Sequence, residues 1–121
     1  MLRRALCLAL CAALLPARLA AAEFNRIESR DEFLAAVQGR NLEIGLFGLS
    51  LTVNPDGTIT GSALGWDVTG RWSWQDGYFC REMDWSGMPI PYNCQLVELR
   101  GDEMRFTVDR GAGEAARFAL R

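Results

Sequence analysis

Residues 66–81 read WDVTGRWSWQDGYFCR, and this stretch decides the fold. Its first ten residues alternate between two faces, and one face carries Trp66, Val68, Gly70, Trp72 and Trp74. A period of two is typical of a β-strand with one face on the core. The dipeptide Asp76-Gly77 accepts positive φ and turns the chain into a second strand from Tyr78. The stretch therefore predicts a β-hairpin with an aromatic inner face.

Further strand patterns surround this hairpin. Residues 49–53 and 58–60 flank the turn sequence NPDG, residues 92–99 and 104–108 flank a turn at 100–102, and residues 110–113 lead into a last strand. Short strands separated by turn signals every 8–12 residues indicate an antiparallel meander. Open strand edges in a sheet so rich in glycine and acidic residues would be free to pair with other chains, which favours a closed sheet. We expect a mainly β fold of about seven antiparallel strands in a small barrel.

One short helix precedes the strands. Ser29 and Glu32 have the spacing of a capping box, and Phe33, Leu34 and Val37 follow at helical spacing before a glycine. This pattern predicts a helix of about three turns. We expect it to plug or cover one end of the sheet.

The first 22 residues have the pattern of a secretory signal. Two arginines precede an apolar run from Ala5 to Leu15, Pro16 breaks it, and cleavage is expected between Ala22 and Glu23. A membrane anchor would need an apolar run of about 20 residues. We therefore expect a periplasmic or secreted protein whose residues 23–121 form one small domain.

The positions of the cysteines are consistent with export of the protein. Cys7 and Cys11 leave with the signal, so the mature chain keeps Cys80 and Cys94 in an oxidising compartment. This lone pair has neither CxxC redox spacing nor enough ligands for zinc. A structural disulfide is expected, and no metal or cofactor.

The charge pattern excludes several classes of partner. All 13 basic residues are arginine, ten of them lie after the signal, and they face 15 acidic residues there, which gives a net charge of −5. Nucleic acid and an anionic membrane surface are therefore disfavoured. The chain has no histidine, which excludes a His-dependent triad and His-ligated metal.

Two strand registers are possible for the hairpin at residues 66–81. A two-residue turn at Asp76-Gly77 places Trp72 opposite Arg81, whereas a three-residue loop with a bulge places Trp72 opposite Cys80. We favour the second, because a buried disulfide costs no desolvation whereas an inward arginine must find a partner or water.

The motifs GxWxWxDGYFCR (70–81), CQxV (94–97) and DRG (109–111) resemble a family of short exported bacterial proteins often labelled dihydrodipicolinate reductase. The resemblance spans nearly all of residues 23–121 and implies a small exported β-rich domain. The reductase activity in that label depends on a glycine fingerprint between a strand and a helix, on paired histidines and on a lysine. This chain has no histidine or lysine to match them.

The candidate binding surface consists of the aromatic block and the segment after it, with Trp66, Trp72, Trp74, Arg81, Trp85, Met88, Ile90 and Tyr92 as its members. Aromatic faces stack on ligands, and Arg81 can add a carboxylate contact. We favour core packing for the tryptophans, because the interior of a small barrel is filled by large side chains. Residues 86–91 are expected to form a loop that exposes Met88 and Ile90 to a protein partner or folds over the barrel mouth.

The function that these features favour is a non-enzymatic binding or inhibitor-like module of the cell envelope, with a protein or small-molecule partner. Two alternatives stay open: the reductase of the family label, and an enzyme that uses carboxylates in a Trp-lined cleft. Asp67, Asp76, Glu82 and Asp84 are the acids nearest the aromatic block, and a solvated surface is the favoured interpretation for them.

Overall fold

The computed structural model describes residues 23–121, and the predicted export signal at residues 1–22 lies outside the described residues. The helical elements are α1 (Arg30–Val37) and the 3-10 turns η1 (Gly45–Phe47) and η2 (Asp109–Gly111). The strands are β1 (Asn25–Arg26), β2 (Leu42–Ile44), β3 (Leu49–Val53), β4 (Thr58–Ala63), β5 (Trp66–Gln75), β6 (Tyr78–Trp85), β7 (Met88–Arg100), β8 (Glu103–Thr107) and β9 (Ala115–Leu120). Within residues 23–121 no helix is long and apolar enough to cross a membrane.

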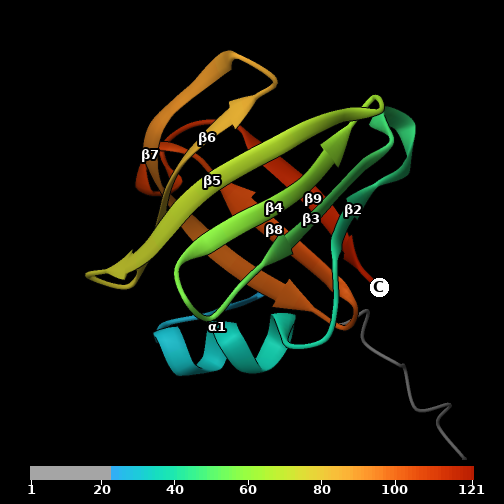
Figure 1. Ribbon diagram of the computed structural model, residues 1–121. Coiled ribbons are helices and arrows are strands. Elements are labelled where there is room, and N and C mark those ends of the chain that lie inside the picture. Colours follow the sequence, from blue (N-terminus) through green and yellow to red (C-terminus); the bar gives the residue numbers. More distant parts are fainter. Residues whose placement is uncertain (1–22) are drawn as a thin grey trace, which may run out of the picture.

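Strands β2 to β9 close into an eight-stranded antiparallel barrel (Figure 1). Closure depends on β7, whose first part pairs with β6 and whose last part pairs with β8. The predicted mainly β fold with one short helix and a closed barrel is confirmed, and the expected seven or so strands fall short of the nine observed. The pattern missed β1 and β2 because their two and three residues are too short to show an alternation.

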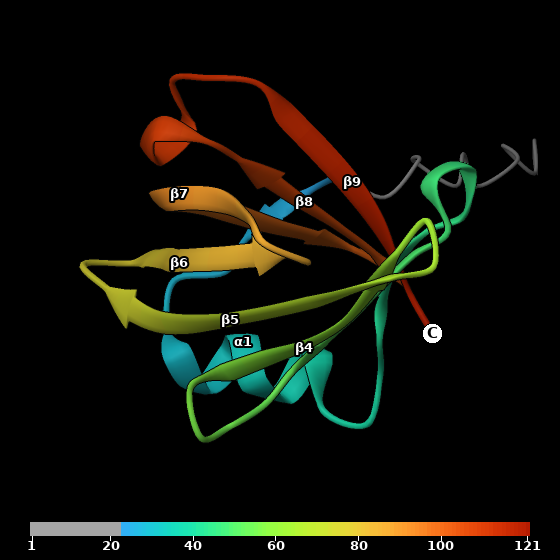
Figure 2. The ribbon, with the colours of Figure 1, turned by 45° about the horizontal axis from the view of Figure 1, so that its top comes forward.

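The turns alternate between the two ends of the barrel. The β3–β4 and β5–β6 turns lie at the end that α1 covers, and Figures 1 and 2 both show α1 beside the β3–β4 turn. The opposite end carries the β2–β3, β4–β5, β6–β7 and β8–β9 turns, and we refer to it as the open end. The helix covers one end of the barrel, as the sequence predicts.

The helix is held in place by two buried side chains, Phe33 and Val37. The Oγ of Ser29 accepts a hydrogen bond from the backbone N of Glu32 at 3.2 Å, so the predicted cap is formed. Phe33 is fully buried and its ring lies 5.0 to 5.4 Å from the rings of Trp72, Trp74 and Phe79. The helix has eight residues and is therefore shorter than the three turns expected. Its role is to carry Phe33 into the barrel.

The β5–β6 hairpin adopts the two-residue register, so the favoured three-residue loop was wrong. Asp76 and Gly77 both have positive φ, +51° and +83°, as a type I′ turn requires. Trp72 therefore faces Arg81. Arg81 can face inward because it has a hydrogen-bond partner: its Nη1 donates to the backbone oxygen of Pro91 at 2.7 Å, beside an irregularity in the β6–β7 pairing.

The disulfide Cys80–Cys94 is formed as predicted, but it lies on the outer face of the barrel. The two residues face each other on β6 and β7, and Cys80 faces the exposed Ser73 on β5. The turn η2 packs against β7, where the side chain of Asn93 donates to the Asp109 carboxylate and accepts from its backbone N. The disulfide therefore ties β6 to β7 outside the core, and Cys80 is nevertheless only 1% exposed.

The segment 86–91 is not the loop that the sequence predicts. Only Ser86 and Gly87 form a turn, and the residues from Met88 onward belong to β7. The alternation was hidden because Pro89 and Pro91 interrupt it, although each proline can occupy a strand where its nitrogen is not needed for pairing. The disulfide consequently links the two paired strands β6 and β7 and does not anchor a free loop.

Glycine permits a close approach on the inner side of the sheet. A Cβ on Gly70 would lie 2.5 Å from the backbone oxygen of Glu82 and would collide with Met83. Gly61, on the neighbouring strand, is crowded in the same way by the backbone of Ser50. Both positions face inward, so they let the strands bend sharply enough for the barrel to close.

Replacing Phe33 by alanine is expected to lower the free energy of unfolding by about 3–5 kcal/mol, because the change empties a fully enclosed site. Phe47 is the matched control, since it is 53% exposed, and Phe47→Ala is expected to change stability by less than about 0.5 kcal/mol. Urea denaturation followed by tryptophan fluorescence measures both. Equal losses for the two variants would contradict the assigned role of Phe33.

Removing both cysteines by Cys80→Ala and Cys94→Ala is expected to cost about 2–5 kcal/mol of unfolding free energy, because the bond restricts the unfolded chain. The same denaturation experiment, repeated with dithiothreitol, supplies the control: the reductant should destabilise the wild type and leave the double variant unchanged. A wild type insensitive to reduction would show that the bond adds no stability.

Candidate functional site

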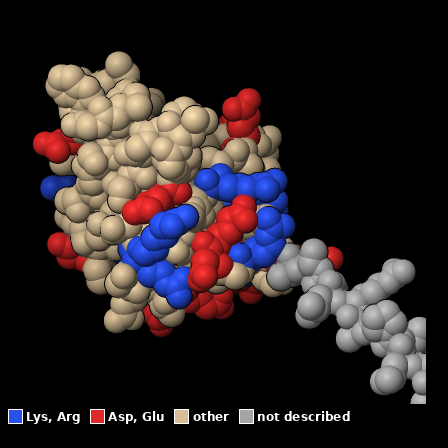
Figure 3. All heavy atoms as spheres, turned by 90° about the vertical axis from the view of Figure 1, so that its right-hand side faces the viewer, with Lys and Arg blue, Asp and Glu red and all other residues tan. Residues whose placement is uncertain are grey.

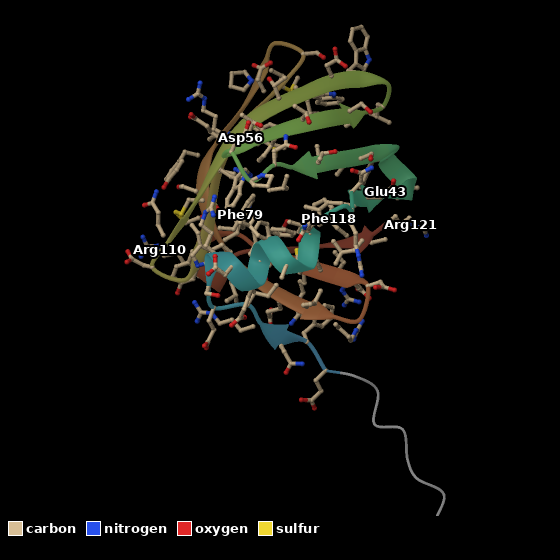
Figure 4. All side chains as sticks on the ribbon, turned by 60° about the horizontal axis from the view of Figure 1, so that its bottom comes forward. Glu43, Asp56, Phe79, Arg110, Phe118 and Arg121 are labelled. Carbon is tan, nitrogen blue, oxygen red and sulfur yellow. A yellow bond between two sulfur atoms is a disulfide. The ribbon has the colours of Figure 1, made fainter. Side chains whose placement is uncertain are left out.

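The barrel interior holds a cavity of about 180 Å³. Its lining comes from the inner faces of seven strands and from the β8–β9 turn, and consists of Leu42, Leu51, Val53, Ile59, Phe79, Arg81, Met83, Gln95, Phe106, Val108, Ala116 and Phe118. In Figure 4, Phe79 and Phe118 lie between the strands on the inner side of α1. The cavity reaches Ala116, which is exposed, and Arg81, which is half-buried, so it opens between the β6–β7 pair and the β8–β9 turn.

The cavity lies next to a cluster of large side chains at the α1 end. There Phe33, Trp72 and Phe79 stack against one another with centroid separations of 5.0 to 5.7 Å. The cavity borders this cluster at Phe79 and extends to the small inward residue Ala116 of β9. The interior is therefore packed around Phe33 and hollow beside it.

Two polar side chains line this otherwise apolar space. Arg81 uses Nη1 for the Pro91 carbonyl and forms no ion pair with any acid of residues 23–121. Partial burial lowers the pKa of its guanidinium, which nevertheless stays cationic at neutral pH. Gln95 is 6% exposed as a residue, its side chain makes no hydrogen bond within the described part of the chain, and its amide therefore keeps access to open space, which the cavity provides. These two residues are the chemically active part of the lining.

None of the four acids near the aromatic block lines the cavity. Asp67 and Glu82 are exposed, Asp76 forms the β5–β6 turn, and Asp84 accepts a hydrogen bond from the backbone N of Gly87 at 2.7 Å. A carboxylate enzyme would need two acids that converge on a substrate space. The alternative of such an enzyme in a Trp-lined cleft therefore finds no supporting geometry here.

The tryptophans divide into two groups, and none of the four lines the cavity. Trp72 is 6% exposed and its Nε1 donates to the backbone oxygen of Asn54, while Trp74 stacks on Phe33. Core packing, the interpretation favoured for these residues, holds for this pair. Trp66 and Trp85 lie instead at the open end, where they border a shallow hollow with Met88.

The open end carries exposed apolar side chains on three neighbouring turns. We define the apolar rim as Leu46, Phe47, Leu64, Trp66 and Met88, which are between 53% and 85% exposed. The backbone N of Leu64 donates to the oxygen of Phe47, and that of Ser86 donates to Asp67, so the turns lie side by side. Figure 3 shows charged side chains gathered on the lower part of one face, whereas the upper part, toward the open end, is mostly uncharged.

The remaining candidates lie outside the barrel interior. Ile90 is half-buried and Tyr92 is 56% exposed, and both border a surface groove between β6 and β7. Of the eight residues that the sequence nominates as a binding surface, Arg81 alone lines the cavity.

Gln95 is the site residue that the sequence pattern missed. It shares an inward face with Val97 and Leu99 on β7, and so a polar residue stands where the alternation requires an apolar one. That exception to the alternation was the available signal.

The described residues contain no group of three or more Cys, Asp or Glu side chains arranged to hold a metal ion. Comparisons with protein-family models, with curated proteins and with solved structures found no match to this chain. The cavity and the apolar rim are therefore the features of the structure that bear on function.

Proposed function

We propose that this protein is a non-enzymatic binding module of the cell envelope that holds a small apolar molecule inside its barrel. The observation that carries the proposal is the cavity of about 180 Å³, ten of whose twelve lining residues are apolar. A packed protein interior leaves few voids larger than a water molecule. A dry apolar cavity of about 150 Å³ binds benzene, which sets the size of ligand that this space accepts.

The location of the site supports binding. The mouths of β-barrels are common ligand sites, because the closed sheet fixes the wall while the open end admits the ligand. Here α1 and Phe33 cover one end, and Ala116 at the other end is exposed. A ligand can therefore enter at the open end without displacing the helix.

The compartment in this proposal is the periplasm or the exterior. The Cys80–Cys94 disulfide is consistent with an oxidising compartment outside the cytoplasm. The secretory pattern of residues 1–22 supports the same location. A small-molecule carrier or sensor of the envelope would meet its ligand there.

Titration with 2-phenylethanol is expected to shift the NMR methyl signals of Leu51, Val53 and Ile59. Ala116→Leu extends a side chain into the cavity and is expected to weaken binding at least about fivefold, which corresponds to about 1 kcal/mol of lost contact. Ala115→Leu is the control, because Ala115 is exposed and its side chain points to the opposite face. Shifts confined to surface methyl groups, or equal affinity in both variants, would overturn the proposal.

The apolar rim supports a second candidate, the inhibitor-like module. Monomers rarely expose contiguous apolar surface, and such patches mark contacts with other proteins. Phe47 and Trp66 are the largest side chains of the rim, and they lie on turns held together by the Leu64–Phe47 backbone hydrogen bond. In this candidate the rim would dock on an extracellular protease.

The second candidate is tested by titrating the oxidised 23–121 chain against secreted serine proteases and metalloproteases. Inhibition is expected to weaken about tenfold or more in the double variant Phe47→Ser, Trp66→Ser, because buried aromatic anchors dominate protein interfaces. Arg71→Met, an exposed change on β5, is the control. Absence of inhibition by the wild type would exclude the inhibitor-like module.

A further inference from the structure

The cavity contains an amide with unused hydrogen-bonding capacity. Gln95 is 6% exposed as a residue, and its side chain forms no hydrogen bond with residues 23–121. No enclosed side-chain N or O atom of the described residues lacks a partner, so the amide of Gln95 keeps access to open space and is free to bond water or a ligand there. Gln95 lines the cavity, so the space that its amide faces is the space a ligand would fill.

A cation lies beside this amide. In the β6–β7 pairing Phe79 faces Gln95 and Arg81 faces Asn93, so Arg81 and Gln95 are diagonal neighbours on the inner face. The Arg81 guanidinium gives one donor to Pro91 and keeps its other N–H groups. No acid among residues 23–121 pairs with it. A half-buried cation without an anion is costly unless a ligand supplies the charge.

The other ten lining residues are apolar and include the rings of Phe79, Phe106 and Phe118. The cavity therefore offers one polar corner, made by Arg81 and Gln95, and an apolar remainder. A planar guanidinium next to an amide N–H matches the two oxygens of a carboxylate. A single cation gives no second positive charge for a dianion such as phosphate.

We propose that the cavity binds a small monocarboxylate with an apolar body about the size of a benzene ring, the carboxylate lying at Arg81 and Gln95. This inference rests on the proposed function, since it names the chemical class of the ligand for the same site. The apolar body lies toward Ile59 and Phe118, and the carboxylate lies near the mouth of the cavity. Burial lowers the pKa of Arg81, and a bound carboxylate opposes that effect by favouring the charged guanidinium.

The test compares two ligands with the same ring and different head groups, phenylacetate and 2-phenylethanol, by calorimetry and NMR on the oxidised 23–121 chain. The wild type is expected to bind phenylacetate at least about tenfold more tightly, as a hydrogen bond to a charged group implies. Arg81→Met is expected to abolish this preference and to change the affinity for 2-phenylethanol less than about threefold. Gln95→Leu, which keeps the size of the side chain, is expected to weaken phenylacetate binding alone.

Arg71→Met is the matched control, because Arg71 is exposed on β5 and its side chain faces away from the interior. It should leave both affinities unchanged. Equal affinity of the wild type for the two ligands would overturn the carboxylate assignment while the apolar site stands. A wild type that binds neither ligand would overturn the proposed function as well. The wild-type comparison decides the question even if Arg81→Met does not fold.

Discussion

The insertion of Phe33 into one end of the barrel is the interaction on which the rest of the structure depends. Its ring contacts Trp72, Trp74, Phe79 and Phe106, which come from three strands and otherwise would leave a wide opening. Aromatic pairs in such tilted and edge-to-face arrangements add stability beyond the area they bury. The cluster closes the α1 end and concentrates the bulky side chains there.

The cavity lies directly beside that cluster, because Phe79 and Phe106 belong to both. An eight-stranded barrel has an interior that side chains can just fill, or that can hold one small ligand if they do not. Here the cavity extends from Phe79 to the small inward residue Ala116, and the two remaining tryptophans lie at the rim. The outer disulfide and the packing of η2 on β7 support the barrel wall from outside without filling the interior. Core packing and ligand space thus lie side by side in one barrel.

The sequence predicts those features that depend on local pattern. The capping box at Ser29, the alternation of β5, the pairing of Cys80 with Cys94 and the closure of the sheet are confirmed. The β5–β6 register was wrong, because the partner of Arg81 is the Pro91 carbonyl, and the irregular pairing that presents it cannot be read from the residues of the hairpin. The cavity depends on the sum of side-chain volumes from seven strands, which no single stretch reveals. Arg81 was nominated for its chemistry, whereas Gln95 becomes a site residue only once its inward direction is known.

The measurement that bears most directly on this partly hollow barrel is X-ray diffraction from a crystal of the oxidised 23–121 chain pressurised with xenon. Xenon enters dry apolar cavities and is located by its anomalous scattering. We predict one strong xenon peak inside the barrel, bounded by Leu51, Ile59 and Phe118, and none at the α1 end around Phe33. An interior without xenon, with side chains closed over the space of the cavity, would contradict the structure of the site described above.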